Sequence, residues 1–293
     1  MDYRKPTNKK EHPKIAISKF GKVKSREVSD ILEIAKECYN RLQPHEVALV
    51  DLYFFEKSSS MNAFMAKELK EVGVVSASFD ELFFAIHDAY RGTSRITLCL
   101  ERLKKLPKLV QDGGIRHEVA HSVLHGSLLY YVFPLPPALS SFANRLKFSQ
   151  EYATNLLYLI SIAVKDYEVS SLLNRCGYVE DQIAYAKHLL IVSESDKLSW
   201  QMARGKRSAE ILCLVSYLKT AGYAAPFLSN KTYGEEMKEL LAESFSFLPR
   251  EFSIPFLSLI LKSFPYLGTD TFSNVNHIAG LVVRNIVEPI LLG

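Results

Sequence analysis

The 293-residue sequence has little glycine or proline and only a few scattered cysteines. Its 13 glycines and 12 prolines are too few for long flexible linkers, so we expect packed structure over most of the chain. The cysteines Cys38, Cys99, Cys176 and Cys213 form no CxxC pair, which indicates buried apolar residues in a reducing compartment.

The sequence also lacks segments that direct a protein into or across a membrane. The closest candidate for a span, residues 152–164, falls short of the roughly 18 residues that a span needs, and charged residues flank it. The N-terminus has no apolar signal-peptide core. We therefore expect a cytoplasmic protein with no membrane partner. GxGxxG, P-loop and GxSxG motifs are absent too, which argues against dinucleotide-binding, P-loop and serine-hydrolase classes.

Positive charge is concentrated at the start of the chain, although the net charge is only +4. We interpret residues 1–26 as a basic, solvated and partly disordered tail. This tail is the one feature that would suit nucleic acid, and we do not expect nucleic acid as a partner. The basic residues of the tail are Arg4, Lys5, Lys9, Lys10, Lys14, Lys19, Lys22, Lys24 and Arg26.

Two regions of different pattern follow the tail, and together they predict an α+β fold. Up to residue 135, stretches with helical period alternate with short apolar runs rich in β-branched and aromatic residues. From residue 136 onward the pattern is helical throughout. We therefore expect a mixed αβ lobe over 27–135 and a mainly α-helical lobe over 136–293. The expected helices are 26–42, 61–72, 139–173, 180–193, 208–220, 234–247, 253–264 and 274–291, and the expected strands are 47–55, 83–90 and 96–100. A further helix is expected to cover residues 109–110 or to restart after Gly113-Gly114, and to run through residues 117–125.

The most informative motif is His117-Glu118-Val119-Ala120-His121, an HExxH sequence. On a helix the two histidines lie four residues apart on one face, where both imidazoles can bind one zinc ion. Glu118 follows the first histidine, so its carboxylate can reach a water on the metal without being a ligand. Zinc polarises a carbonyl and activates water, and Glu118 would act as the general base that hands the proton to the leaving amine.

A catalytic zinc site needs a third protein ligand, and the helix predicted downstream offers three acids. Asp166 lies on an apolar stripe with Ile162, where an acid is costly unless a cation meets it. Glu151 lies on the same stripe. Glu168 shares a stripe with Lys165, which we expect to face solvent. We favour Asp166 and keep Glu168 and Glu151 as alternatives.

Several further residues are candidates for secondary roles. His125 lies four residues beyond His121 and is expected to be a donor behind the ligands, a residue at the rim, a substrate contact or a partly buried histidine bonded to the backbone. Tyr130, Tyr131, Tyr167 and His188 are candidates for stabilising an oxyanion, although burial statistics favour a packing role for each of them.

The order of a strand followed by the HExxH helix resembles zincin-type metallopeptidases of the gluzincin kind. Residues 117–125 and 162–173 together are also similar to the metallopeptidases that precede von Willebrand factor A domains. In those proteins an alanine-rich AxD motif supplies a ligand, and Ala163-Val164-Lys165-Asp166 comes near it, which implies Asp166. In gluzincins a glutamate has this role. The resemblance also implies a zincin-like first lobe and an edge strand near residues 98–100 that pairs with an extended peptide.

The sequence therefore predicts a zinc-dependent metallopeptidase, a hydrolase with Zn²⁺ as cofactor and a peptide or protein as substrate. His117, His121 and Asp166 would bind the metal and Glu118 would be catalytic. The alternative is a non-catalytic helical interaction protein with a structural or vestigial zinc site. A structural site needs no carboxylate beside its first ligand and usually fills four positions with protein groups. The sequence indicates neither the cleavage preference nor the oligomeric state.

Overall fold

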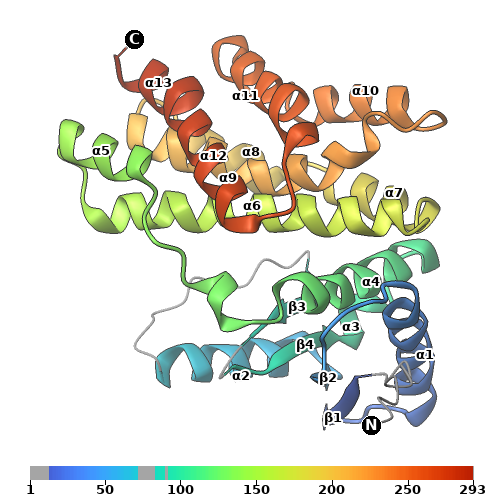
Figure 1. The fold of residues 1–293 in the computed structure, drawn as a ribbon. Helices are drawn as coiled ribbons and strands as arrows, with labels where there is room; N and C mark the ends of the chain where they lie inside the picture. Colours follow the sequence, from blue (N-terminus) through green and yellow to red (C-terminus); the bar gives the residue numbers. More distant parts are fainter. Residues whose placement is uncertain (1–12, 72–82, 90–91, 293) are drawn as a thin grey trace, which may run out of the picture.

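The computed structural model describes residues 13–71, 83–89 and 92–292, and within them the fold is mixed α+β. Figure 1 shows a small sheet with its helices on one side of the molecule and a larger group of helices on the other. The four strands are β1 (Lys14–Phe20), β2 (Leu49–Phe55), β3 (Ala85–Asp88) and β4 (Ser94–Cys99). The α-helices are α1 (Ser25–Arg41), α2 (Ser58–Glu71), α3 (Leu100–Leu103), α4 (Lys108–His125), α5 (Pro137–Leu146), α6 (Gln150–Arg175), α7 (Glu180–Leu189), α8 (Glu194–Ala203), α9 (Arg207–Ala224), α10 (Gly234–Ser244), α11 (Arg250–Ser263), α12 (Thr271–Val282) and α13 (Glu288–Leu292). Short 3₁₀ turns are η2 (Leu128–Tyr131), η3 (Ala225–Phe227) and η4 (Phe264–Tyr266), and η5 (Val283–Val287) is a π-helical segment.

The sheet has the strand order β1-β2-β4-β3. β1, β2 and β4 are parallel, and β3 runs antiparallel to β4 with His87 opposite Ile96. Alternation along β2 sends Phe54 to the main core and Phe55 to a small second core with Met61 of α2. The sheet thus has helices on both faces, with α4 on the face that carries the main core.

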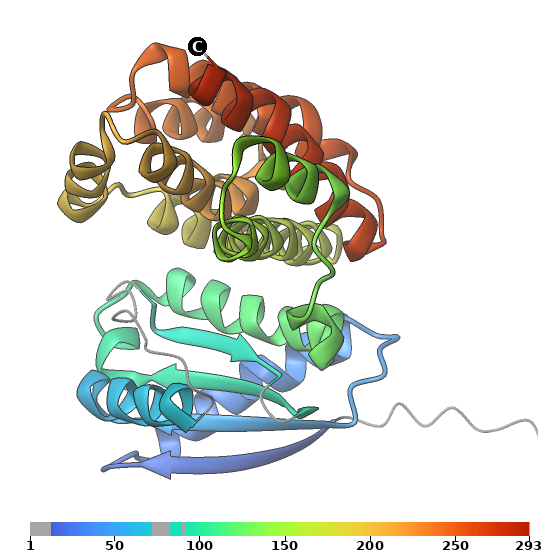
Figure 2. The same cartoon turned by 90° about the vertical axis from the view of Figure 1, so that its left-hand side faces the viewer.

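The long helix α6 is the centre of the helical part. It spans 26 residues, which corresponds to roughly 40 Å. It packs against α4 on one side and against α9 and α12 on the other, and Figure 2 views it nearly along its axis between these neighbours. Because α6 is covered on several sides, even its charged residues Lys165, Asp166 and Glu168 are buried.

Several expectations from the sequence need correction. Lys14–Phe20 is a strand paired with β2, so the second half of the predicted tail is structured. Glu168 and Lys165 are buried instead of facing solvent. The strand that includes Leu98 lies between β2 and β3, so the edge of the described sheet beside α4 is β3. Residues 1–12 of the tail, Val72 and Tyr90 lie outside the described residues.

The helix predicted over 139–173 is two helices, α5 and α6, because Lys147 adopts a left-handed conformation with φ 55° and Ser149 caps the second one. The predicted division near residue 135 coincides with the change from strands and helices to helices alone. One hydrophobic core runs through both parts, from Leu52 to Ile160 and Ile278, and the division into lobes stays a prediction. No described helix is both long enough and apolar enough to span a bilayer.

Candidate metal centre

Helix α4 carries the HExxH motif and is packed closely against its neighbours. It begins directly after Pro107, which occupies the N-cap position without a side-chain hydrogen bond to the first turn, and continues without a break through Gly113 and Gly114. A Cβ atom on Gly114 would lie 2.1 Å from the ring of Phe84, and one on Gly113 would lie 2.5 Å from the carbonyl oxygen of Asp181. The two glycines therefore let α4 approach the start of β3 and α7, one turn before the motif.

His117, His121 and Asp166 converge on one point between α4 and α6. Their nearest ligand atoms all lie within 4.8 Å of one another, and all three side chains are buried. His121 Nε2 is 3.0 Å from His117 Nε2 and 3.0 Å from Asp166 Oδ1, and His117 Nε2 is 3.6 Å from the same oxygen. Within the described part of the chain, this is the group of side chains suited to hold a metal ion.

The donor set fits a zinc ion. Nitrogen and oxygen ligands about 2.0–2.1 Å from a tetrahedral zinc ion lie roughly 3.3 Å apart, close to the separations between these three atoms. Burial raises the pKa of Asp166, but the close contacts of its carboxylate with the imidazoles of His117 and His121 outweigh it and hold this pKa below its ordinary value. Burial and the neighbouring His117 lower the pKa of His121. An ionised carboxylate beside a neutral imidazole is the protonation state that zinc binding requires.

The ring of His117 is oriented by aromatic neighbours. It meets Tyr223 edge-on at 5.0 Å between centroids and Tyr185 at 5.7 Å. Its Nδ1 atom is buried and has no hydrogen-bond partner among the described residues. The side of His117 away from Asp166 is therefore apolar, and its Nε2 atom is the one turned toward His121 and Asp166.

Glu118 lies beside this group without belonging to it. Burial, together with the charge of Asp166, raises the pKa of Glu118 to about 7, while the charges of His117 and Lys219 act in the opposite direction. The backbone of His87 also acts to lower the pKa of Glu118, as the smallest of these influences. Strand β3 therefore contributes to the electrostatic environment of the candidate base.

His87 itself is a site residue that the sequence analysis missed. Its ring stacks on His121 with the planes 6° apart, and its two nitrogens lie 2.8 Å from Ser94 Oγ and 2.9 Å from the Tyr131 hydroxyl. The available signal was a histidine inside the apolar run at 83–90. That signal was weak, because the sequence does not reveal which strand lies beside α4.

The remaining candidates lie at different distances from the centre. The Tyr131 hydroxyl reaches the site through His87, and the ring of Tyr130 contacts His125. Tyr167 packs against Phe264, and His188 is half-buried on α7.

The two alternative acids are placed away from the ligand group. Glu151 is exposed in the first turn of α6, whereas Asp166 lies four turns further along the helix. Glu168 is buried, but its carboxylate accepts from His125 Nε2 at 2.9 Å. His125 is fully buried on the far side of His121, with its Nδ1 atom 3.2 Å from His121 Nδ1. The structure therefore brings Asp166, and neither glutamate, to the two histidines.

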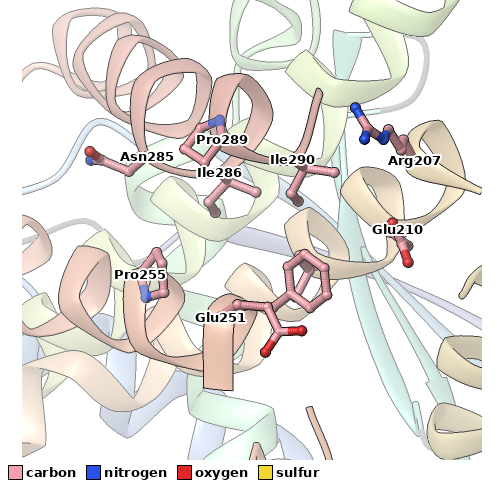
Figure 3. Close-up of a pocket in the computed structure, with 10 residues that line it drawn as sticks. Arg207, Glu210, Glu251, Pro255, Asn285, Ile286, Pro289 and Ile290 are labelled. Carbon is pink, nitrogen blue, oxygen red and sulfur yellow. The ribbon is translucent and has the colours of Figure 1, made fainter. Parts of the chain in front are cut away.

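A separate pocket of about 380 Å³ lies between α9, α11 and the π-helical segment η5, as Figure 3 shows. Arg207, Glu210 and Glu251 supply its charged groups, and Pro255, Ile286 and Ile290 supply apolar ones. It shares no residue with the metal centre. The metal centre, in contrast to this pocket, has the convergent set of reactive groups.

Comparison of the chain with protein-family models, with curated protein sequences and with solved structures finds no match. The function of the chain therefore has to be argued from the chemistry of its site.

Proposed function

We propose that this protein is a zinc-dependent peptidase whose first part is a zincin-like αβ lobe. The observation that supports this most strongly is the convergence of three buried ligand atoms from His117, His121 and Asp166 beside Glu118. An exposed pair of histidines on a helix would need no buried carboxylate opposite it. A buried acid placed between two imidazoles is costly unless a cation joins them.

In this proposal His117, His121 and Asp166 hold the ion, and the described residues leave the fourth position open. Bound zinc polarises a carbonyl and lowers the pKa of water from 15.7 to about 7. Glu118 accepts a proton from the attacking water and returns it to the leaving nitrogen of the peptide bond.

Tyr131 is the residue that we propose to stabilise the oxyanion. Its hydroxyl lies 2.9 Å from His87 Nδ1, and the ammonium of Lys165 lies 4.2 Å from the centre of its ring. A phenol held at this position donates a hydrogen bond to charge that develops on the carbonyl oxygen. Tyr131 is also partly exposed, in contrast to the ligands, so it stands between the buried centre and solvent.

Strand β3 is the segment that we propose to bind the substrate backbone. It is the edge of the described sheet and lies beside α4. An extended peptide that pairs with an edge strand gains main-chain hydrogen bonds without sequence preference. The exposed apolar side chains of Leu128, Leu129 and Val132, which follow α4, would then contact the peptide's side chains.

One observation favours a second candidate, a non-catalytic protein with a structural zinc site. His117, Glu118, His121 and Asp166 are each less than a tenth exposed, so the centre is more enclosed than a peptidase needs to admit a polypeptide. A peptidase with this structure would have to open between η2 and β3 during each turnover. A structural site would have no such need.

Elemental analysis and a cleavage assay on the wild type and Glu118→Gln separate the two candidates. We expect one zinc per chain in both proteins, and cleavage of an unfolded protein substrate that falls by about 10²- to 10⁴-fold in the variant. Removal of zinc with a chelator should abolish the wild-type activity, and added zinc should restore it. Zinc in both proteins with cleavage by neither would favour the structural site. A wild type that takes up no zinc when zinc is supplied would contradict both.

A further inference from the structure

A series of buried hydrogen bonds leads from the metal centre to helix α12. It runs from His121 on α4 to His125, from His125 to Glu168 on α6, and from Glu168 to Thr271 and Asn274 on α12. The side chains in this chain of contacts are all buried. Figure 1 shows α12 lying across α6, on the side away from the sheet.

The donor and acceptor roles along these hydrogen bonds are set at the α12 end, by Asn274 and the backbone of Gly268. Gly268 N–H donates to Asn274 Oδ1 at 2.9 Å, so the oxygen of that amide is fixed by a backbone group. Asn274 Nδ2 must then point the other way, where it donates to Glu168 Oε1 at 2.6 Å and to the Gly268 carbonyl at 3.0 Å. An asparagine held in this way cannot flip to accept a bond from Glu168.

Glu168 receives donors on both of its oxygens. Asn274 donates to Oε1, and Thr271 Oγ1 donates to Oε2 at 2.8 Å. An ionised carboxylate only accepts hydrogen bonds, so the contact of 2.9 Å with His125 requires a proton on His125 Nε2. A neutral imidazole with its proton on Nε2 has a lone pair on Nδ1. His125 Nδ1 therefore accepts, and the facing atom, His121 Nδ1, must donate.

The consequence for His121 is a single tautomer. With its proton on Nδ1, His121 presents a lone pair at Nε2, the atom that lies 3.0 Å from both His117 Nε2 and Asp166 Oδ1. We propose that His125 and Glu168, anchored by Asn274, form a positioning relay that fixes the metal-binding tautomer of His121 and makes α12 part of the metal centre. This inference rests on the proposed zinc site for its effect on affinity, but the tautomer belongs to the metal-free protein.

Without the relay, the alternative tautomer of His121 is stabilised. Asp166 Oδ1 is an acceptor 3.0 Å from His121 Nε2, so a proton on Nε2 would form a hydrogen bond with it. That bond would have to break before metal binds. Loss of the residue that hydrogen-bonds the second ring nitrogen of a metal-binding histidine typically weakens metal affinity by about 10- to 100-fold. We expect a loss of this size when residue 125 can no longer accept a hydrogen bond from His121.

The first test measures the tautomer directly by ¹⁵N NMR of metal-free protein with labelled histidines, of which the chain has eight. At a pH well above the ordinary imidazole pKa of about 6.5, we expect His121 to carry its proton on Nδ1 and His125 to carry its proton on Nε2. His125→Phe keeps a flat ring but cannot accept a hydrogen bond from His121 Nδ1. In this variant the His121 proton should move to Nε2. A wild-type His121 with its proton on Nε2 would overturn the proposal without any variant.

The second test measures zinc affinity by competition with a chelator of known affinity. We expect His125→Phe to bind zinc about 10- to 100-fold more weakly than the wild type. Thr271→Val is the matched control, because it removes a donor of the same network and leaves His125 bonded to Glu168. It should keep the wild-type tautomer and change the Kd by no more than a few-fold.

Glu168→Gln extends the test if His125→Phe does not fold. The glutamine amide would face Asn274 Nδ2, which can only donate, on one side and His125 Nε2 on the other. Because it has one oxygen instead of two, it cannot accept a hydrogen bond from both. We expect weaker zinc binding and a mixture of His121 tautomers. Unchanged affinity and an unchanged tautomer in a folded Glu168→Gln would refute the relay. A wild type that lacks zinc affinity but has the expected tautomer would count against the proposed function alone.

Discussion

The two helices that meet at the metal centre contribute to it in different ways. Helix α4 supplies His117, Glu118 and His121 within five consecutive positions, so the helical period alone places them together. Helix α6 supplies Asp166 from 45 residues beyond His121, and only the packing of α6 against α4 brings it there. One half of the site depends on local geometry and the other half depends on the tertiary fold.

The largest effect should come from changing Asp166, the ligand that the tertiary fold brings to the site, and should appear as a loss of zinc affinity. Asp166→Asn keeps the shape of the side chain but removes its charge from the centre. We expect zinc affinity to fall by about 3–5 kcal/mol, about 10²- to 10⁴-fold in Kd, because a buried charge that loses its partner is poorly compensated. Titration with a competing chelator measures this loss.

Glu151→Gln is the matched control on the same helix. Glu151 is exposed in the first turn of α6, so its charge should be screened and its loss should leave zinc affinity unchanged. Equal zinc affinity in Asp166→Asn and Glu151→Gln would mean that α6 contributes no ligand.

The sequence could predict the local half of the site and only part of the tertiary half. An acid on an apolar stripe pointed to Asp166, because burial of such a residue needs a reason. The same reasoning failed for Glu168, since it assumed that α6 has one solvated face. In the structure α4, α9 and α12 surround α6, and two of the donors that satisfy Glu168, Thr271 and Asn274, come from residues more than 100 positions away. No local pattern reveals such partners.

The fold shows a similar division between local and distant information. The helices α1 and α4 and the strands β2 and β4 were predictable from period and composition. The break between α5 and α6 was not, because Lys147 adopts a left-handed conformation without glycine or proline to signal it. Strand β1 was hidden by the basic residues in and around it, of which Lys14 and Lys19 lie in the strand, where they suit the exposed edge of a sheet.

A second prediction concerns the connection between the two parts, where Tyr131 lies. Tyr131→Phe removes the hydroxyl beside His87 and keeps the ring under Lys165. If Tyr131 stabilises the oxyanion, kcat should fall by about 10²- to 10³-fold while bound zinc stays at the wild-type level. Steady-state kinetics together with elemental analysis measure both quantities.

Tyr130→Phe serves as the neighbouring control, because it keeps the ring contact with His125. It should retain most of the wild-type kcat. Similar losses in the two variants would indicate that η2 matters for packing, and that neither hydroxyl takes part in the reaction.

A third prediction tests how closely α4 must approach the sheet. In Gly114→Ala the new methyl group would meet the Phe84 ring, so α4 or β3 must shift. We expect the free energy of unfolding to fall by about 1–3 kcal/mol, as is usual when a packed core is overfilled. Gly280→Ala on α12 is the control, because nothing lies within 4 Å of a Cβ there. It should stabilise the protein by up to about 1 kcal/mol, since alanine favours helix. Urea unfolding of both variants would detect the opposite signs.

The smallest effect should come from the contact that ties α1 to the motif helix. Ser122 Oγ donates to the Val119 carbonyl at 2.6 Å, so the buried Tyr39 hydroxyl, also at 2.6 Å, must be the donor to Ser122. Tyr39→Phe should therefore cost only about 0.5–1.5 kcal/mol of unfolding free energy and leave zinc affinity unchanged, because the histidines keep their positions on α4. In a double-mutant cycle with Ser122→Ala, the two losses should not add, because both variants remove the same hydrogen bond. Additive losses would show that the Tyr39 hydroxyl is not coupled to Ser122, and a loss of zinc affinity in Tyr39→Phe would show that even the local half of the site depends on distant packing.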